Sequence, residues 1–302
     1  MENFLMMVRI QAILLIYLLV GVYARKKNII TDNSQQSFID FLIRIALPCM
    51  VFESFNQELT ARQLLSASLI LAVAFAVSLF SLLLGKVLFR HYPARRKSIL
   101  QYGALISNSG FAGLPLVESA YGSLGLFYAS VFIIPNRIFM WSAGISLFTQ
   151  ADFKSRMKNI LLNPGIIAVF LGIFRMLTRL PFPAFADTAI KSIGNCTASL
   201  SMIVVGTILA DISPKSVFDR DAFLLSFIRL LALPGFTLIL LKMVNFDMTA
   251  TAVAVILTAM PVGTTTALLG KKYHADAEFA SKCVFVSTAL SLVTVPFLTL
   301  FL

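Results

Sequence analysis

Two polar interruptions break long apolar segments of this 302-residue chain, half a chain length apart. One is the run Ser107–Pro115, and the other is the run Pro261–Thr266. Pro removes a backbone donor and Gly relaxes the chain, so both runs predict broken helices. Each break exposes the N-terminus of a half-helix, whose free N–H groups and partial positive charge attract anions. The chemistry that these residues predict is therefore the binding of an anion.

Amide, hydroxyl and backbone donors supply that chemistry. Asn108 is the first choice of ligand, because its amide can donate to a carboxylate in a medium of low dielectric constant. The other residues predicted to bind are Ser109, Gly110, Pro261, Gly263 and Thr264, and the predicted crossover or hinge residues are Ser107, Gly113, Pro115 and Val262. The alternative is that each break is an ordinary kink with small residues for close helix packing.

The composition places these breaks in a membrane protein. Hydrophobic residues make up 58% of the chain and charged residues 13%, with a mean hydropathy of +0.87. Soluble proteins contain about 25% charged residues. Apolar segments of about 20 residues can cross a bilayer. The expected fold is all-α, with ten membrane spans at 4–24, 34–55, 64–89, 98–121, 123–149, 159–178, 187–210, 221–243, 248–271 and 277–301.

The charge distribution predicts the orientation. The net charge is +11, and most of the 25 Lys and Arg residues fall in loops after the odd-numbered spans. Basic loops mark the cytoplasmic face, where they also contact anionic lipid headgroups. Both termini are therefore predicted to lie outside a cell membrane. Nucleic acid is not an expected partner, because no soluble domain is predicted, and no cofactor or metal site is expected, because the two histidines lie near loop ends.

Each half of the chain, 1–152 and 153–302, contains five predicted spans. Because five is odd, the second half enters the membrane from the opposite side, which predicts two inverted repeats related by an axis in the membrane plane. The breaks fall at corresponding positions of spans 4 and 9. Paired interruptions of this kind indicate the binding site of a secondary transporter.

Three motifs resemble the auxin efflux carrier family, which includes bacterial malate and malonate permeases and plant PIN auxin exporters. They are Ile106–Leu116 in span 4, Ala259–Tyr273 continuing to Ser281, and Ile45–Phe52 with its Ala-Leu-Pro sequence. The resemblance implies a fold similar to bile-acid transporters and sodium/proton antiporters, with crossed discontinuous helices 4 and 9. Spans 1, 2, 6 and 7 would form a scaffold, and spans 3–5 and 8–10 would form a moving transport domain. The resemblance also implies a homodimer that assembles through the scaffold.

The resemblance also carries individual residues. Asn108 falls on the carboxylate-binding Asn of the family, and Pro261 on its second crossover Pro. The chain departs from the plant exporters at Ser107, where they have a further Pro, and it lacks their long central loop, so auxin is not supported. Asn136 and Arg137, two further predicted substrate-binding residues, lie in span 5 where relatives often carry an uncharged amide.

Charged residues within spans are the remaining candidates, because burying a charge in a bilayer is costly and usually marks a function or a partner. Arg137 is predicted either to pair with the carboxylate of the substrate or to be neutralised internally by an acid such as Glu118. Asp40 and Arg44 share a helix face at i and i+4 and are expected to form an ion pair. The residues that could couple transport to an ion are Asp40, Arg44 and Glu118. Glu278 and Lys282 are expected to pair, and Arg229 to snorkel or to pair with Asp211.

The function expected from these features is secondary transport of small organic anions, mono- or dicarboxylates of the malate type, by an elevator-type movement. An alternative is sodium-coupled symport, with Na⁺ held by the carbonyls of span 9 and Thr264–Thr266. A membrane sensor or an intramembrane enzyme is a third possibility, but the sequence has no HExxH motif or mid-span Asp pair for such an enzyme.

Overall fold

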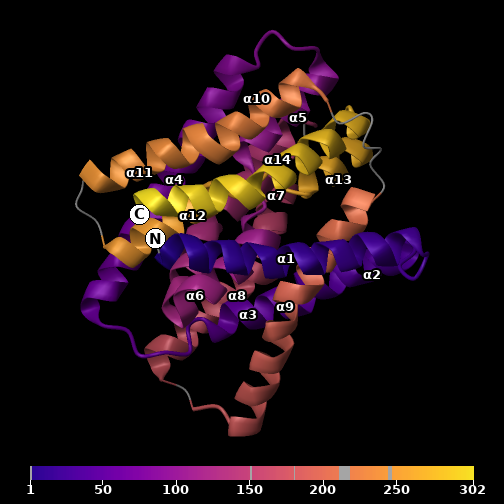
Figure 1. Cartoon of the computed structure of the whole chain (residues 1–302). Helices are drawn as coiled ribbons and strands as arrows, with labels where there is room; N and C mark the ends of the chain where they lie inside the picture. Colours follow the sequence, from indigo (N-terminus) through magenta and orange to yellow (C-terminus); the bar gives the residue numbers. More distant parts are fainter. Residues whose placement is uncertain (1, 150–151, 180, 211–217, 244–246) are drawn as a thin grey trace.

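The computed structural model describes residues 2–149, 152–179, 181–210, 218–243 and 247–302, and every regular element in these ranges is a helix (Figure 1). The α-helices are α1 (Glu2–Lys26), α2 (Asp32–Phe41), α3 (Leu47–Glu53), α4 (Ala61–Leu88), α5 (Ala94–Leu105), α6 (Leu114–Phe139), α7 (Phe153–Leu161), α8 (Pro164–Thr178), α9 (Ala184–Ala210), α10 (Arg220–Phe227), α11 (Leu233–Met243), α12 (Met248–Thr258), α13 (Thr265–Lys272) and α14 (Ala277–Leu298). Wider π-helical turns are η1 (Leu42–Ala46), η2 (Ser109–Gly113), η3 (Met140–Gly144) and η5 (Ile228–Ala232), and η6 (Thr299–Phe301) is a 3₁₀ turn.

Seven helical segments within the described ranges are long and apolar enough to cross a membrane, against the ten spans predicted. They are Phe4–Lys26, Asp32–Glu53, Ala61–Leu88, Ser109–Gly144, Ala184–Ala210, Arg220–Met243 and Ala277–Phe301. Two shorter apolar helices are Pro164–Thr178 and Met248–Thr258. The all-helical membrane fold is therefore confirmed, whereas length and hydropathy alone identify fewer spans than predicted.

The difference has local causes. Ser109–Gly144 is 36 residues long and contains a sharp kink at Gly122, where φ is +62° and ψ is −156°. A residue with a side chain rarely adopts this conformation, which explains the glycine. The predicted span 159–178 is also not one continuous helix. Helix α7 ends at Leu161, and α8 begins at Pro164 with Asn163 as its N-cap. The side-chain oxygen of Asn163 accepts hydrogen bonds from the N–H groups of Gly165 and Ile166 at 3.1 and 3.3 Å.

Three of the π turns precede a proline by two residues. Pro48, Pro115 and Pro234 follow η1, η2 and η5 respectively. Proline cannot donate to the carbonyl four residues earlier and its ring clashes with that carbonyl, so the preceding turn widens. In η2 the freed carbonyl belongs to Phe111, and it accepts a hydrogen bond from the Ser201 hydroxyl of α9 at 2.8 Å. A proline in one helix thereby creates a polar contact with another.

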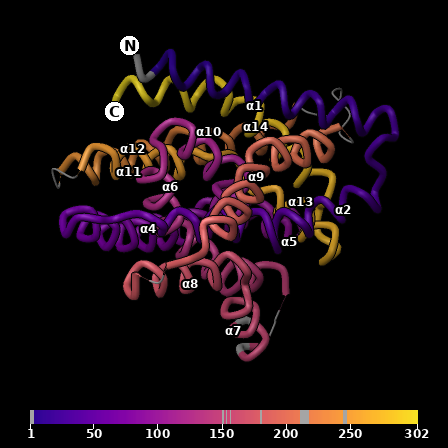
Figure 2. Tube along the Cα trace, turned by 90° about the horizontal axis from the view of Figure 1, so that it is seen from below, coloured from indigo at the N-terminus to yellow at the C-terminus, as the bar shows by residue number. Residues whose placement is uncertain are grey.

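The helices pack into two groups. The first contains α1, α2, α3, α8 and α9, and the second contains α4, α5, α6 and α10 to α14. Figure 1 shows α4, α5, α10, α11 and α14 on one side of α1, with α3, α8 and α9 on the other. Contacts between α1 and α14, and between α9 and η2, connect the groups. In two views at right angles the start of α1 lies beside the end of the chain (Figures 1 and 2).

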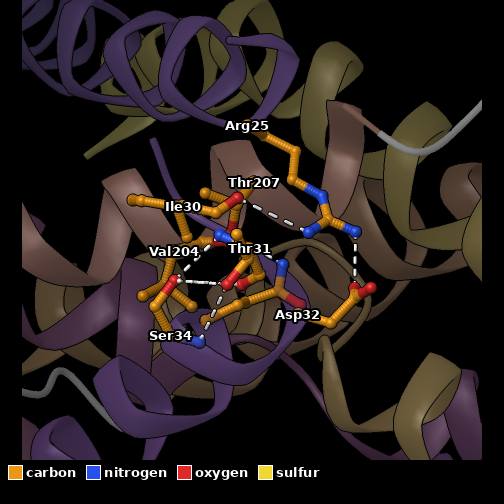
Figure 3. A network of polar contacts seen from close by, with 8 residues as sticks. Arg25, Ile30, Thr31, Asp32, Ser34, Val204 and Thr207 are labelled. Atoms are coloured by element: carbon orange, nitrogen blue, oxygen red, sulfur yellow. Dashed lines mark hydrogen bonds and ion pairs between the residues drawn. The ribbon is translucent and has the colours of Figure 1, made fainter. Parts of the chain in front are cut away.

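A polar network connects the end of α1 to α2 and α9 (Figure 3). Arg25 donates to the carboxylate of Asp32, and Thr31 caps α2 through a reciprocal pair of hydrogen bonds with Ser34. Gln35 donates to the Thr207 hydroxyl at 2.8 Å, and that hydroxyl donates to the Val204 carbonyl at 2.7 Å. The turn between α1 and α2 is thus attached to α9 as well as to its own flanking helices.

Helices α1 and α9 approach closely at two glycines. A Cβ atom at Gly206 would overlap the carbonyl oxygen of Leu18, and one at Gly21 would overlap that of Ile203. Small residues allow such close approach of backbones within a membrane. This contact therefore sets the distance between the longest helices of the first group.

We expect Gly206→Ala to lower the unfolding free energy by about 1–3 kcal/mol, because the added methyl group must displace backbone rather than a flexible side chain. Thermal unfolding of the purified protein in detergent measures the change. Gly235→Ala in α11 is the matched control, since a Cβ atom there meets nothing within 4 Å. Equal melting temperatures for the two variants would contradict the tight contact.

Candidate substrate site at the contact of two broken helices

The breaks between α5 and η2 and between α12 and α13 lie against each other and run antiparallel. The N–H of Asn108 donates to the carbonyl of Pro261 at 2.8 Å, and the N–H of Gly263 donates to the carbonyl of Ile106 at 3.0 Å. Ser107 and Val262 therefore form an isolated antiparallel bridge. A non-helical backbone in a membrane interior needs partners of this kind. The two predicted interruptions are in direct contact, and each satisfies the other.

Side chains complete the hydrogen bonding of the two breaks. The N–H of Val262 donates to the hydroxyl of Ser287 in α14 at 3.0 Å, and the same hydroxyl donates to the Cys283 carbonyl at 2.7 Å. The carbonyl of Asn108 accepts from the N–H groups of Ala112 and Gly113. The second break is thus fixed to α14, and the first forms the start of η2.

Arg229 contacts both broken helices from η5. Its guanidinium donates to the Ala104 carbonyl of α5 at 3.0 Å, and to the carbonyls of Thr258 and Met260, at the end of α12, at 2.9 and 3.4 Å. Only 2% of the residue is exposed, so the expectation that Arg229 snorkels is wrong. The alternative partner, Asp211, lies outside the described residues. The position of Arg229 within an apolar segment indicated that it has a buried partner. The sequence could not identify that partner, because the acceptors are backbone carbonyls.

A cavity of about 580 Å³ lies next to the breaks, between the two helix groups. Predicted binding residues that line it are Asn108, Gly110, Gly263, Thr264 and Arg137, together with the predicted hinge residue Ser107. Its opposite wall comes from α2, η1, α3 and α8, and includes Asp40 and Arg44. The second half-helices begin at Ser109 and Thr265. The cavity is therefore adjacent to their N-terminal ends.

Asn108 presents a free donor at this position. Its side-chain nitrogen is buried and has no hydrogen-bond partner among the described residues. The hydroxyls of Ser109 and Thr266 are in the same condition. A buried polar group without a partner costs about 1–3 kcal/mol, so a ligand that accepts from the Asn108 amide would recover that energy. Binding of a ligand by the Asn108 amide stays a prediction.

Arg137 also lies on the cavity wall without an acidic partner in the described part of the chain. One nitrogen of its guanidinium is 3.8 Å from the Met140 sulfur, and another is so near Gly110 that a Cβ atom there would overlap it. Glu118 is not its partner, because Glu118 lies near the start of α6, where Lys191 of α9 attracts its carboxylate, whereas Arg137 lies in the last turn of α6. Of the two predicted roles for Arg137, neutralisation by Glu118 is wrong.

The expected ion pair between Asp40 and Arg44 is not formed. Asp40 instead accepts a hydrogen bond from Gln36 at 3.3 Å. The π turn η1 begins at Leu42, so the helix between the two residues does not keep the 3.6-residue period on which the i,i+4 prediction depends. Both side chains line the cavity separately. In regular α14 the same rule succeeds, because Lys282 and Glu278 pair at 2.8 Å.

Several predicted residues do not line the cavity. They are Ser109, Asn136, Pro261, Gly113, Pro115, Val262 and Glu118. Pro261 and Val262 instead hold the two breaks together, and Pro115 begins α6. Sequence reasoning missed Tyr102, Trp141 and Lys272, which all line the cavity, and it named Thr265 only as a possible Na⁺ ligand. The Tyr102 and Thr265 hydroxyls lie 3.1 Å apart, across the two broken helices. Aromatic residues in apolar helices carry no distinct signal, so only the packing identifies them.

The membrane-length helices and the cavity enclosed between them identify the chain as a polytopic membrane protein. A known family, described as Membrane transport protein, matches the chain twice, over residues 5–157 and 149–299. An uncharacterized transporter of Methanocaldococcus jannaschii is 25% identical over 94% of both chains. One of Methanothermobacter thermautotrophicus is 26% identical over 93% of this chain and 94% of its own length. The chain belongs to this membrane transport protein family, the auxin efflux carrier-like family that its motifs resemble.

We expect Ser287→Ala to lower the unfolding free energy by about 1–3 kcal/mol, because it leaves the buried N–H of Val262 without an acceptor. Chemical unfolding in detergent measures this change. The matched control is Ser226→Ala, which removes an equally buried hydroxyl that bonds only a carbonyl of its own helix. A loss at Ser287 no greater than the loss at Ser226 would contradict the role of Ser287 in holding the second break.

Proposed function

We propose that this membrane transporter is a secondary transporter of small organic anions, mono- or dicarboxylates of the malate type. The observation that carries the proposal is that Asn108 and Arg137 line the same cavity, where two half-helix N-termini meet. Among the described residues, the Asn108 amide nitrogen has no hydrogen-bond partner and the Arg137 guanidinium has no acidic partner. Each half-helix N-terminus carries roughly half a positive elementary charge. Together these groups favour a carboxylate over a neutral or cationic solute.

The helix packing supports an elevator-type movement. The group α4 to α6 with α10 to α14 carries both breaks and Arg137, and it would move against the group α1 to α3 with α8 and α9. These groups contain the predicted transport spans 3–5 and 8–10 and the predicted scaffold spans 1, 2, 6 and 7. The cavity lies between them. Displacement of one group against the other would therefore carry the site across the membrane.

Ten spans and two inverted repeats, 1–152 and 153–302, belong to the same proposal. The segment Ser109–Gly144 divides at Gly122, its first part completing the span that begins with α5. Helices α12 and α13 form a second broken span, and α8 a short one. An even number of crossings agrees with the proximity of the chain ends (Figures 1 and 2). The two successive family matches agree with two repeats.

The proposed topology places the cavity on the cytoplasmic side in this conformation. Lys272, Gln36 and Asn163 line it. Gln36 lies in the first half of α2, Asn163 caps α8 and Lys272 ends α13. Each is near a basic loop that the positive-inside rule assigns to the cytoplasm. Both termini would lie outside the cell membrane. The apolar side chains exposed on α8, such as Phe170 and Phe174, leave that helix of the scaffold available for lipid or for a second copy, so a homodimer through the scaffold remains part of the proposal.

We expect Arg137→Gln to raise the dissociation constant for malate about tenfold or more, because a charge-assisted hydrogen bond contributes about 1.5–3 kcal/mol. The thermal shift of the purified protein in a malate titration measures binding. Lys282→Gln is the control, since it removes the same charge from an ion pair away from the cavity. Dimethyl malate, which is neutral, should give no shift. Unchanged affinity in Arg137→Gln would exclude it as the counter-charge.

We expect Asn108→Asp to abolish malate exchange, because a carboxylate at this position repels the anion and removes the amide donor. Counterflow of labelled malate into malate-loaded proteoliposomes measures exchange without assuming a coupling ion. Asn33→Asp, an exposed change in α2, is the control and should exchange as the wild type does. Binding of malate by the wild type without any counterflow would favour a sensor over a transporter.

A further inference from the structure

Arg229 joins the C-terminal ends of the two half-helices that precede the breaks. The carbonyl acceptors are Ala104 in the last turn of α5, and Thr258 and Met260 at the end of α12. These ends come from opposite halves of the chain, and Arg229 comes from a third helix segment, η5. The guanidinium thus bonds to both C-terminal ends. The residues that follow these ends, Ser107 and Val262, are joined by the antiparallel bridge.

The charges of this arrangement are complementary. The C-terminal end of a helix carries roughly half a negative elementary charge, so two such ends offer about one negative charge to a cation. The guanidinium supplies one positive charge, and within the described ranges it forms no ion pair with a carboxylate. Among the described residues, backbone carbonyls are therefore the partners of the Arg229 charge. Replacing Arg229 would leave three buried carbonyls with one donor fewer each.

The C-terminal ends of helices attract cations. In transporters built from discontinuous helices, half-helix C-terminal ends and unwound carbonyls coordinate the coupling Na⁺, while half-helix N-terminal ends bind anionic substrate groups. Both kinds of end are present here. The N-terminal ends border the cavity, but the carbonyls of the C-terminal ends already have an internal cation.

We propose that Arg229 is a built-in cation in the position of a coupling ion, so that this protein binds its anion without Na⁺, an inference that rests on the anion transport proposed above. Arg229 is a positioning residue, because it contacts the backbone of the crossing rather than the cavity. It neutralises the negative ends of α5 and α12, and the positive ends at Ser109 and Thr265 then determine the field in the cavity. Because the negative helix ends are neutralised and the positive ends are not, the cavity favours a negatively charged substrate.

The geometry of the guanidinium suits this role. Its planar, delocalised charge carries five donors in a fixed arrangement, so one side chain can reach carbonyls on two helices at once. A lysine would supply the charge from a single point and reach fewer of the three oxygens. We therefore expect Arg229→Lys to keep the charge balance with weaker attachment, and Arg229→Ala to leave a space lined by carbonyl oxygens that a small cation can enter.

The test compares melting temperatures with Na⁺ or with the large cation N-methyl-D-glucamine as the only cation. In Arg229→Ala, Na⁺ should raise the melting temperature by about 2 °C or more, because a cation that binds only the folded state stabilises it. Millimolar guanidinium should do the same. The wild type, Arg229→Lys and the control Lys282→Gln should melt at the same temperature with either cation. A general loss of packing at Arg229 would not make stability depend on Na⁺.

The malate titration connects this test to transport. The wild type should bind malate equally in both cations, whereas Arg229→Ala should bind about tenfold more weakly without Na⁺ or guanidinium than with them. If the wild type gives no malate response while Arg229→Ala responds to Na⁺, the anion transport is wrong but the internal cation is supported.

Two results would overturn the inference. One is stabilisation of the wild type by Na⁺ relative to N-methyl-D-glucamine, which needs no variant and so stands even if a variant fails to fold. The other is an Arg229→Ala protein that responds to neither Na⁺ nor guanidinium. If Arg229→Ala cannot be purified, Arg229→Gln replaces it, because its amide carries no charge and Na⁺ dependence is expected there as well.

Discussion

Hydrogen bonding of the interrupted backbone is the constraint on which the rest of the structure depends. A helix that stops within an apolar interior leaves N–H and C=O groups that no solvent can satisfy. Here Asn108 and Gly263 donate across the gap to Pro261 and Ile106, and each break completes the other. Neither interruption could persist alone. The position of the cavity, the direction of the half-helices and the surroundings of Asn108 all follow from this mutual contact.

Proline extends the same constraint to neighbouring helices. Pro115 frees the Phe111 carbonyl, which Ser201 of α9 then satisfies from the other helix group. Pro234 follows the π turn that carries Arg229, and the guanidinium satisfies carbonyls of α5 and α12. Backbone carbonyls left unpaired at a proline or at a helix end are thus satisfied by side chains of other helices. The polar contacts that hold the two breaks together arise where regular helix geometry is interrupted.

The sequence predicts the parts of this structure that local chemistry controls. The Gly, Pro and small polar residues predicted the positions of both breaks. The i,i+4 spacing predicted the pair Glu278–Lys282, because α14 is a regular helix there. The pair Asp40–Arg44 failed because a π turn changes the period between the residues, and no simple spacing rule indicates that change. The contacts of Arg229 and the cavity position of Tyr102 depend on which helices meet. Whether Asn108 and Arg137 bind a substrate remains a prediction.

The close approach of α1 and α9 has a mechanical consequence. At Gly21 and Gly206 the two helices meet backbone to backbone, with no side chain that could change rotamer. On another face, α1 packs against α14 of the other helix group. Shear between packed helices proceeds through small rearrangements of interdigitated side chains. The glycine contact resists sliding between α1 and α9. In the proposed movement, α1 would therefore stay with the scaffold and slide only along the face that packs against α14.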